Sequence, residues 1–216
     1  MKDLSFDEKR ERMIIEQLMP RGILDAKVLA AFRKVPRHEF VGPELSGRAY
    51  DDYPLPIGSH QTISQPYMVA VMTQSLGLKG GEAVLEIGAG SGYQMAILAQ
   101  IAKEIYSVER VPALAEQAGK ALGRLGYTNY RIKVGDGTLG WEEHAPYDAI
   151  IVTAGAPGVP ESLLRQLKDG GRLVIPIGNA FSQVLTLVEK RGAAAEMTRI
   201  CGCVFVPLIG KEGWAP

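Results

Sequence analysis

The sequence predicts an α/β fold in which a doubly wound, mostly parallel sheet carries extra helices on its N-terminal side and antiparallel strands at its C-terminal edge. Two observations support this fold class. From Ala83 onward, short apolar runs alternate with segments of helical periodicity, the pattern of parallel strands joined by covering helices. After the last helix two apolar runs follow each other closely, which predicts a terminal hairpin on the sheet edge.

The individual elements follow from the same patterns. Seven apolar runs predict strands, and the last two form the hairpin. They cover residues 83–88, 105–109, 130–136, 147–154, 171–178, 183–190 and 199–208. Helices are predicted over 66–76, 94–101, 112–125 and 160–167. A ligand is expected at the carboxyl ends of the parallel strands.

Two further helices are predicted near the N-terminus. Ser5 and Glu8 have the spacing of a capping box, and apolar residues then repeat at helical spacing until Pro20. The second helix is predicted to begin at Asp25 and to end before Pro36. Neither helix carries an evident reactive group, so packing is their expected role.

One domain is expected over residues 1–216, because apolar residues are spread evenly and no linker is evident. Within it, 1–78 is predicted to be a helical elaboration that covers the functional site. Residues 79–216 are predicted to form the ligand-binding core.

The charge balance limits the partners. The 24 basic and 24 acidic residues cancel, so nucleic acid and membrane surfaces are not expected partners. The first residues lack the apolar core of a secretory signal, and no apolar run approaches the roughly 18 residues of a membrane span. We expect a cytoplasmic protein, with a small molecule or an exposed peptide as partner. A monomer is expected, although no sequence feature specifies the oligomeric state.

A metal site is not expected. The two cysteines, Cys201 and Cys203, would point to one face of a strand, where buried apolar cysteines are the expected interpretation. The three histidines, His38, His60 and His144, are scattered and do not complete a zinc ligand set.

One segment has an unusual composition. Residues 53–78 include no Asp, Glu, Lys or Arg over 26 residues, in a chain with 22% charged residues. The segment is too interrupted by proline and glycine to span a membrane, yet it is rich in Ser, Thr, Gln and His. A polar segment without charge therefore needs a functional or a structural explanation.

A glycine loop follows the first predicted strand of the core. Gly88, Gly90 and Gly92 lie between that strand and a helix, where the backbone can approach a ligand closely. A dinucleotide fingerprint would require glycine where the chain has Tyr93. Glu86, two residues before the loop, would repel a pyrophosphate but would suit an ammonium and a sulfonium. This combination favours S-adenosylmethionine as the ligand.

Acidic residues end the next two strands. Glu109 is placed to accept hydrogen bonds from both ribose hydroxyls, and Asp136, followed by Gly137, is placed to accept one from an adenine amino group. Arg110 either contacts the nucleoside or is an exposed residue at a helix start. Acids at strand ends are often helix caps or turn residues, so the interpretation depends on the three acids and the glycines together.

The chain lacks the motifs of methyltransferases that act on adenine N6 or cytosine C5. The segment 64–67, Ser-Gln-Pro-Tyr, has one proline and precedes the glycine loop, so it does not match an adenine-N6 enzyme. Neither cysteine has the Pro-Cys setting of a cytosine-C5 enzyme. The fourth strand ends in residues that offer no general base, which would suit a carboxylate acceptor that is already ionised at neutral pH.

The chain resembles the protein-L-isoaspartate O-methyltransferases along nearly its whole length. The most discriminating motif is QTISQPYM, because a glycine loop is common to most S-adenosylmethionine enzymes. Matching segments are VLAAFRKVPRHEFV, AYDDYPLPIGSHQTISQPYM, VLEIGAGSGYQ, VGDG, PYDAIIVTAGAP, LKDGGRLVIPIG and FVPLIGKEGW. His60 departs from the pattern, since a smaller residue, often glycine, is expected before Gln61.

The resemblance implies a Rossmann-like class I methyltransferase that uses S-adenosylmethionine. It implies that Thr62, Ile63 and Ser64 lie over the sulfonium, with Ser64 as the catalytic hydroxyl. The implied substrates are isoaspartyl-containing proteins and peptides, whose free carboxylate is methylated so that a succinimide forms and returns aspartate. Neutral donors can orient a carboxylate without holding it too firmly in its ground state, which would explain the missing charges.

Three alternatives stay open. The charge-free segment could be a buried loop whose hydroxyl groups satisfy the backbone. The enzyme could methylate a small-molecule carboxylate or hydroxyl. The chain could also be a regulatory module that binds S-adenosylmethionine without turnover.

Overall fold

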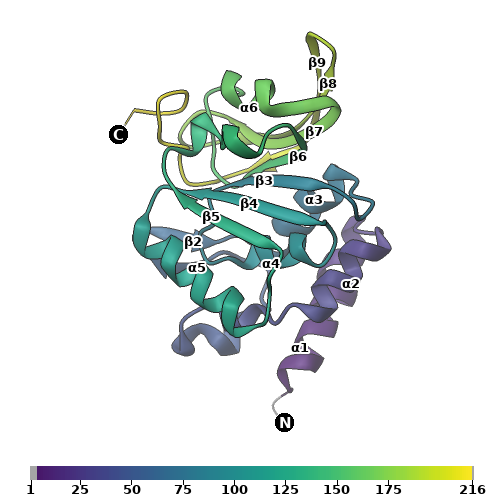
Figure 1. Cartoon of the computed structure of the whole chain (residues 1–216). Helices are drawn as coiled ribbons and strands as arrows, with labels where there is room; N and C mark the ends of the chain where they lie inside the picture. The colour runs from purple at the N-terminus through teal and green to yellow at the C-terminus, as the bar shows by residue number, and fades with distance from the viewer. Residues whose placement is uncertain (1–3, 216) are drawn as a thin grey trace.

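The computed structural model describes residues 4–215, and its centre is a seven-stranded sheet with the strand order β5-β4-β3-β6-β7-β8-β9 (Figure 1). Strands β3 to β7 are parallel, and β8 and β9 are antiparallel additions at one edge, as predicted. The strands are β3 (Ala83–Ile87), β4 (Glu104–Glu109), β5 (Tyr130–Val134), β6 (Tyr147–Val152), β7 (Leu167–Gly178), β8 (Gln183–Arg191) and β9 (Ala194–Cys203). A separate small hairpin consists of β1 (Leu55–Gly58) and β2 (Gln61–Ile63).

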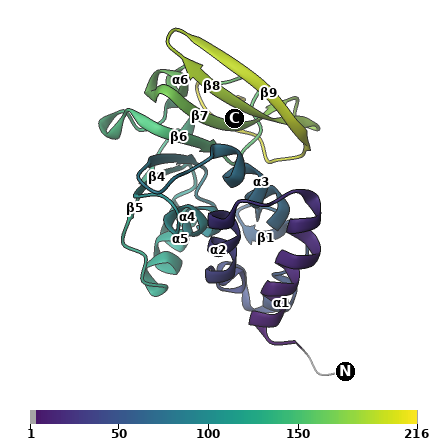
Figure 2. The same ribbon diagram turned by 90° about the vertical axis from the view of Figure 1, so that its right-hand side faces the viewer.

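The helices gather at the N-terminal end of the molecule and on both faces of the sheet (Figure 2). The α-helices are α1 (Phe6–Met13), α2 (Ala26–Lys34), α3 (Pro66–Leu76), α4 (Tyr93–Ala99), α5 (Pro112–Arg124) and α6 (Glu161–Gln166). Short helical turns are η1 (Ile14–Leu18), η2 (Met19–Arg21), η3 (Arg37–Phe40), η4 (Pro43–Arg48), η5 (Gly137–Leu139) and η6 (Glu142–His144). The predicted helix that ends near Pro20 is thus α1 continued by η1 and η2.

The predicted helix starts are confirmed. The Ser5 hydroxyl accepts a hydrogen bond from the backbone N–H of Glu8, and the Glu8 carboxylate accepts one from the N–H of Ser5, which completes the capping box. The Asp25 carboxylate accepts bonds from the N–H groups of Lys27 and Val28 at the start of α2. These caps fix where the N-terminal helices begin.

Two apolar layers enclose the sheet. On β3 and β6 the buried side chains alternate between the two faces, because successive residues of a strand point in opposite directions. Val84 and Ile151 belong to the core that includes α2, α3 and α4, whereas Leu85 and Ile150 belong to the core that includes Leu163 of α6. The sheet is therefore covered on both faces, as a doubly wound fold requires.

The C-terminal hairpin differs from its prediction. Strand β9 begins at Ala194, five residues before the predicted start, and residues 204–208 leave the sheet. Residues 194–199 of β9 are all exposed and, apart from Met197, are small or polar, so they lack the apolar alternation that marks a strand in a sequence. The later part turns away because the side-chain oxygen of Gln183 accepts the N–H of Phe205 at 2.8 Å. Pro207 then bridges to Gly155 beyond the end of β6.

The cysteine prediction is only partly matched. Both Cys201 and Cys203 are free thiols and are half-buried rather than buried. Within residues 4–215, no group of three or more His, Cys, Asp or Glu side chains is arranged to hold a metal ion. None of the helices in the same range is long and apolar enough to cross a membrane.

Candidate active site

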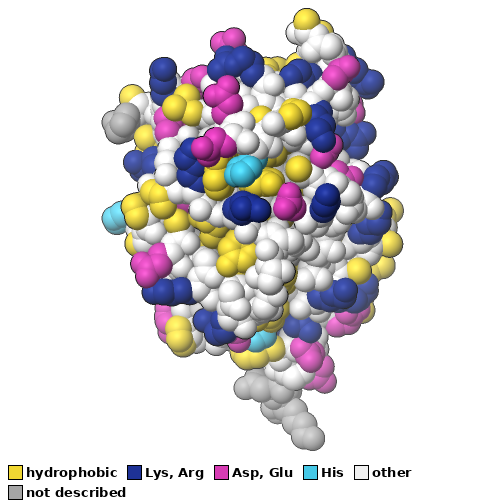
Figure 3. All heavy atoms as spheres, in the orientation of Figure 1, with side chains coloured by type: hydrophobic (Ala, Val, Ile, Leu, Met, Phe, Trp, Pro, Cys, Tyr) yellow, Lys and Arg dark blue, Asp and Glu magenta, His cyan; other side chains and the backbone are white. Residues whose placement is uncertain are grey.

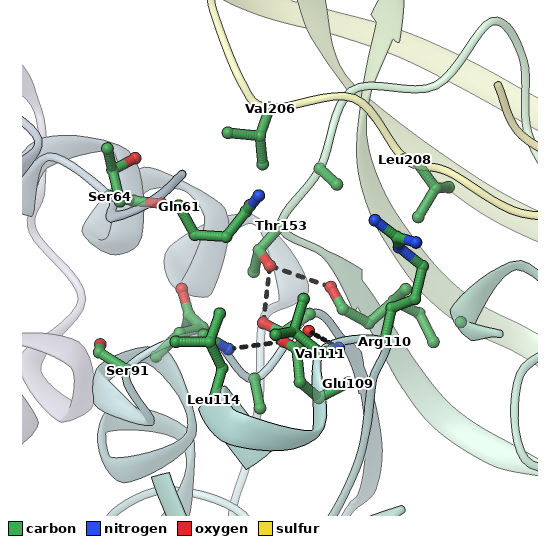
Figure 4. A pocket seen from close by; sticks show the side chains of 18 of the residues that line it. Gln61, Ser64, Ser91, Glu109, Arg110, Val111, Leu114, Thr153, Val206 and Leu208 are labelled. Carbon is green, nitrogen blue, oxygen red and sulfur yellow. Dashed lines mark hydrogen bonds between the residues drawn. The ribbon is translucent and has the colours of Figure 1, made fainter. Parts of the chain in front are cut away.

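An open cavity lies at the carboxyl ends of β3, β4 and β6. One wall comes from residues 61–64 of the β1–β2 hairpin and the following turn, and another from residues 206–209 of the C-terminal segment. In Figure 4, Gln61 and Ser64 lie on one side of the cavity and Arg110 and Leu208 on the other. Figure 3 shows basic and acidic side chains intermixed over the visible face of the molecule.

The glycines of the loop serve different purposes. Gly88 has φ +94°, and a Cβ atom there would lie 2.5 Å from the Thr153 hydroxyl oxygen, so only glycine fits. Gly90 also lines the cavity and has φ +53°. Gly92 does not line the cavity, and a Cβ atom there would lie 3.2 Å from the Cβ atom of Ala118 in α5. Gly92 thus supports packing rather than ligand approach.

Glu109 lies at the centre of the cavity floor. It is only 6% exposed, yet it lines the cavity. One carboxylate oxygen accepts the N–H of Gly90 at 2.9 Å and the other accepts the N–H of Val111 at 2.8 Å. Each oxygen retains a further acceptor position, so the carboxylate can still receive two ribose hydroxyl donors.

Arg110 and Gly137 line the cavity beside Glu109. At Gly137 a Cβ atom would lie 2.4 Å from a side-chain carbon of Ile87, so a side chain would disturb both β3 and the cavity wall. Asp136, immediately before it, is not among the described residues that line the cavity. Asp136 and Gly137, which the sequence analysis treats as one motif, therefore have different surroundings in the structure: only Gly137 lines the cavity.

Asp136 holds the C-terminal segment. Its carboxylate accepts the N–H of Lys211 at 2.8 Å and both the N–H and the hydroxyl of Thr138, at 2.9 and 2.7 Å. Burial alone would raise the pKa of Asp136, but these hydrogen bonds outweigh it and keep the pKa below its ordinary value. The sequence did not reveal this anchoring contact of Asp136 with Lys211. The contact of Asp136 with an adenine amino group stays a prediction.

Glu86 does not match its predicted environment. It is fully buried in β3 and is absent from the described cavity lining, and one of its oxygens accepts the hydroxyl of Ser107 at 2.7 Å. Burial raises its pKa to about 8 despite that hydrogen bond, so the side chain is mostly protonated at neutral pH. Glu86 is not among the described residues that line the cavity, and its second carboxylate oxygen is buried without a hydrogen-bond partner, so its contact with a ligand ammonium group stays a prediction.

The residues implied to cover the ligand are brought to the cavity. Thr62, Ile63 and Ser64 line its wall, together with Gln61. The chain directly after Ser64 is fixed because the Asp52 carboxylate accepts the side-chain amide of Gln65 at 2.7 Å and the N–H of Tyr67 at 3.2 Å. This wall therefore has a defined position relative to the glycine loop.

His60 occupies the tip of the β1–β2 hairpin. The two loop residues, Ser59 and His60, both have positive φ, 49° and 57°. A two-residue hairpin loop of this geometry favours Asn and Gly, which tolerate the left-handed region. The departure from the family pattern therefore falls at a position where glycine is conformationally suited.

Several cavity residues were not singled out by the sequence analysis, although most lie in segments that match the family. Thr153 donates its hydroxyl hydrogen toward the carbonyl oxygens of Ile87 and Gly88, at 2.9 and 2.8 Å, and so fixes the start of the glycine loop (Figure 4). Val206 and Leu208 belong to a segment predicted as a strand. Other residues that line the cavity are Ser91, Gln94, Val111 and Leu114. Their types are common in any core, so residue type alone does not identify them.

Comparison with known proteins gives consistent matches over nearly the whole chain. A family model described as Protein-L-isoaspartate(D-aspartate) O-methyltransferase matches residues 8–213. A protein-L-isoaspartate O-methyltransferase of Geobacter metallireducens is 56% identical over 212 residues, covering 98% of each chain. Protein-L-isoaspartate O-methyltransferase 1 of Syntrophobacter fumaroxidans is 54% identical over 211 residues, covering 98% of this chain and 99% of that one.

Solved structures agree with these matches. One protein-L-isoaspartate O-methyltransferase superimposes with a TM-score of 0.85 at 32% identity, covering 94% of this chain and 67% of that chain. A Plasmodium falciparum β-aspartate methyltransferase in complex with S-adenosyl-L-homocysteine superimposes with a TM-score of 0.80 at 27% identity, covering 93% and 98%.

The sheet, the glycine loop and Glu109 define a class I methyltransferase that depends on S-adenosylmethionine. The chain belongs to the protein-L-isoaspartate(D-aspartate) O-methyltransferase family. Its activity is O-methylation of protein L-isoaspartate, a reaction of protein repair.

Proposed function

We propose that the chain methylates the free α-carboxylate of L-isoaspartyl residues in flexible segments of damaged proteins, and that Ser64 orients this carboxylate. The distribution of charge around the cavity carries the proposal. Among the lining residues within 4–215, only Glu109 and Arg110 are charged, and both lie at the end of β4. The wall formed by residues 61–64 is neutral.

A neutral wall suits a carboxylate acceptor. S-adenosylmethionine, when bound, supplies a methyl group attached to a positively charged sulfur, and methyl transfer to a carboxylate consumes both charges. A fixed cation beside the acceptor would stabilise the reactants more than the transition state. The Ser64 hydroxyl can instead donate one neutral hydrogen bond that aligns the carboxylate for attack.

The cofactor roles are assigned on the same basis. Glu109 accepts the ribose hydroxyls, and Arg110 and Gly137 lie beside the nucleoside. Gly88 and Gly90 allow the backbone to approach the amino acid part of the cofactor, and Thr62 and Ile63 cover the sulfur. Glu86 and Gly92 act indirectly. Glu86 stabilises β3, which leads into the glycine loop, and Gly92 allows this loop to pack against α5.

No proton acceptor is required. The described lining residues include no His, Lys or Cys, and the acceptor carboxylate is ionised at neutral pH. Once methylated, the carboxyl group becomes an ester with a better leaving group, so the neighbouring backbone nitrogen can close a succinimide. Hydrolysis of the succinimide returns aspartate in part of the chains without further help from the enzyme.

A pair of peptides tests the proposal. An isoaspartyl peptide and its aspartyl twin of the same sequence are incubated with methyl-labelled S-adenosylmethionine. Label should enter the isoaspartyl peptide alone and should be released by mild base, as expected of an ester. Equal labelling of both peptides would favour a general carboxyl methyltransferase, and labelling of neither, with cofactor still bound, would favour a regulatory module.

A further inference from the structure

Two apolar side chains beside the β8–β9 hairpin are strongly exposed. Phe181, in the turn between β7 and β8, is 87% exposed, and Val204, just after β9, is 74% exposed. Both lie at the same end of the β8–β9 hairpin, because Gln183 at the start of β8 pairs with Cys203 at the end of β9. Within residues 4–215 these are the two most exposed large hydrophobic side chains.

The turn that carries Phe181 is held rigidly. The side-chain oxygen of Asn179 accepts the N–H groups of Phe181 and Ser182, both at 2.9 Å, and the N–H of Asn179 donates to the carbonyl oxygen of Ser182 at 3.0 Å. These hydrogen bonds fix the backbone of the turn, on which the Phe181 side chain is exposed. The exposure of Phe181 is therefore built into the turn.

A single buried side chain connects this turn to the cavity wall. The amide nitrogen of Gln183 donates to the carbonyl oxygen of Asn179 at 2.6 Å, and its oxygen accepts the N–H of Phe205 at 2.8 Å. The next residue, Val206, lines the cavity. Val204 precedes Val206 by two residues, roughly 7 Å of extended chain. A substrate whose reactive residue is in the cavity would thus reach this pair within a few residues.

The strand order separates this pair from the residues proposed to contact the nucleoside. Glu109 ends β4 and Arg110 follows it, whereas the turn with Phe181 follows β7, which adjoins β6 on the opposite side of β3. The surrounding chain carries no charge over 173–188 and over 200–210, as over 53–78. Such surroundings can bind apolar side chains but offer no ion pair for charged ones.

We infer that Phe181 and Val204 form an apolar contact surface for substrate side chains that flank the isoaspartyl residue. This inference rests on the proposed function, since it assumes a peptide acceptor in the cavity. It adds a selectivity that the cavity alone does not provide: damaged segments with a nearby apolar residue bind better than those with small polar neighbours.

Two isoaspartyl peptides of equal length test this inference, one with leucine and one with serine on both sides of the isoaspartyl residue. The wild-type protein should prefer the leucine peptide by about five- to tenfold in kcat/KM, mostly through KM. In Phe181→Ser this ratio should fall toward one, and in Phe181→Leu most of it should remain. Unchanged unfolding midpoints and S-adenosylhomocysteine affinity would exclude a general disturbance.

Met197→Ser is the matched control, because Met197 is 55% exposed on β9 but lies toward the other end of the hairpin. It should keep the wild-type ratio. A wild-type ratio near one, or a ratio that persists in Phe181→Ser, would overturn the contact surface while leaving the proposed function intact. Failure of the wild type to methylate either peptide would overturn both.

Discussion

A carboxylate oxygen of Glu109 accepts the backbone N–H of Gly90 at 2.9 Å, so the acid at the end of β4 holds the glycine loop that follows β3. The side chain proposed to bind the ribose thus also sets the conformation of the loop. Its removal should therefore affect the cofactor in two ways.

Glu109→Ala is expected to weaken S-adenosylhomocysteine binding by at least a hundredfold. Each hydrogen bond to a charged group contributes roughly 1.5–3 kcal/mol, and the variant loses both ribose contacts. Isothermal titration calorimetry measures the effect. Glu104→Ala, at the opposite end of β4, should bind like the wild type, and unchanged affinity in Glu109→Ala would remove Glu109 from the cofactor site.

Asp136→Ala is expected to lower the unfolding free energy by about 1–3 kcal/mol, because the N–H of Lys211 and the N–H and hydroxyl of Thr138 lose their acceptor. Cofactor affinity should also fall, but less than in Glu109→Ala, since the segment that carries Leu208 loosens.

Asp169→Ala provides a comparison for this variant. Asp169 also accepts a backbone N–H, that of Gly192, but at the far turn of the hairpin. Urea unfolding and calorimetry of the two variants should show lost cofactor affinity only for Asp136→Ala. Equal cofactor affinity in Asp136→Ala and Asp169→Ala would contradict the anchoring role of Asp136.

Glu86→Gln is expected to remove a pH dependence of stability. The folded protein raises the pKa of Glu86 from 4.5 to about 8, so the folded state binds this proton more tightly than the unfolded state. Its contribution is complete below pH 4.5 and is lost as the pH rises toward 8. The free energy of unfolding of the wild type, relative to Glu86→Gln, should fall over that range by at most about 1.4 kcal/mol per pH unit.

Urea unfolding at several pH values between about 5 and 8.5 measures this difference. Glu116→Gln, an exposed change on α5, is the control and should follow the wild type. A constant difference between the wild type and Glu86→Gln across the range would mean that Glu86 titrates normally in the folded protein.

Ser64→Ala is expected to lower kcat/KM for an isoaspartyl peptide by roughly ten- to a hundredfold while cofactor affinity stays near the wild-type value. The loss is smaller than for a donor that stabilises a newly formed charge, because charge is consumed in this reaction. Ser64→Thr should retain more activity, since it keeps the hydroxyl group.

Ser75→Ala is the control for the loss of a hydroxyl, because Ser75 donates within α3 to the carbonyl oxygen of Val71. It should methylate the peptide at the wild-type rate. Wild-type kinetics in Ser64→Ala would mean that the Ser64 hydroxyl does not act on the acceptor and that residues 61–64 have only a structural role.

His60→Gly is expected to stabilise the protein by about 0.5–1 kcal/mol. His60 has φ 57°, where glycine has no steric penalty, although its greater freedom in the unfolded state offsets part of the gain. Thermal unfolding tests this change. Gly58→Ala in the same hairpin, where φ is +89°, should have the opposite sign, and destabilisation by His60→Gly would point to contacts of the imidazole that outweigh its backbone strain.

The sequence predicted the features that depend on local pattern. The parallel strands, the helix caps at Ser5 and Asp25 and the glycine loop each have a signal within a short stretch of chain, and all were found. The course of residues 204–208 was predicted wrongly, because it depends on the side chain of Gln183, 22 positions before Phe205. No local pattern specifies that contact.

Within the site, too, residues with a local sequence signal could be predicted, and contacts between distant residues could not. Glu109 could be placed because the acid after the second strand of such a unit faces the cavity, and Gly88 because it opens the loop. Glu86 was predicted to face the ligand, but burial beside Ser107 could not be read from the sequence, and its contact with the cofactor stays a prediction. Asp136 was placed near the site, but its bond to Lys211 joins residues that are 75 positions apart.

The Asp136–Gly137 pair also bears on how the protein ages. Isoaspartate arises when the nitrogen of the following residue attacks an aspartyl side chain, and glycine hinders that attack least. The chain must keep Gly137, since a Cβ there would collide with Ile87, so a vulnerable dipeptide lies beside the cavity, with only Gly137 in its lining. The hydrogen bonds from Thr138 and Lys211 hold the Asp136 carboxylate in place and ionised, whereas cyclisation needs a mobile, protonated acid. The contacts that anchor the C-terminal segment are therefore expected also to slow, at Asp136, the same damage that the protein repairs.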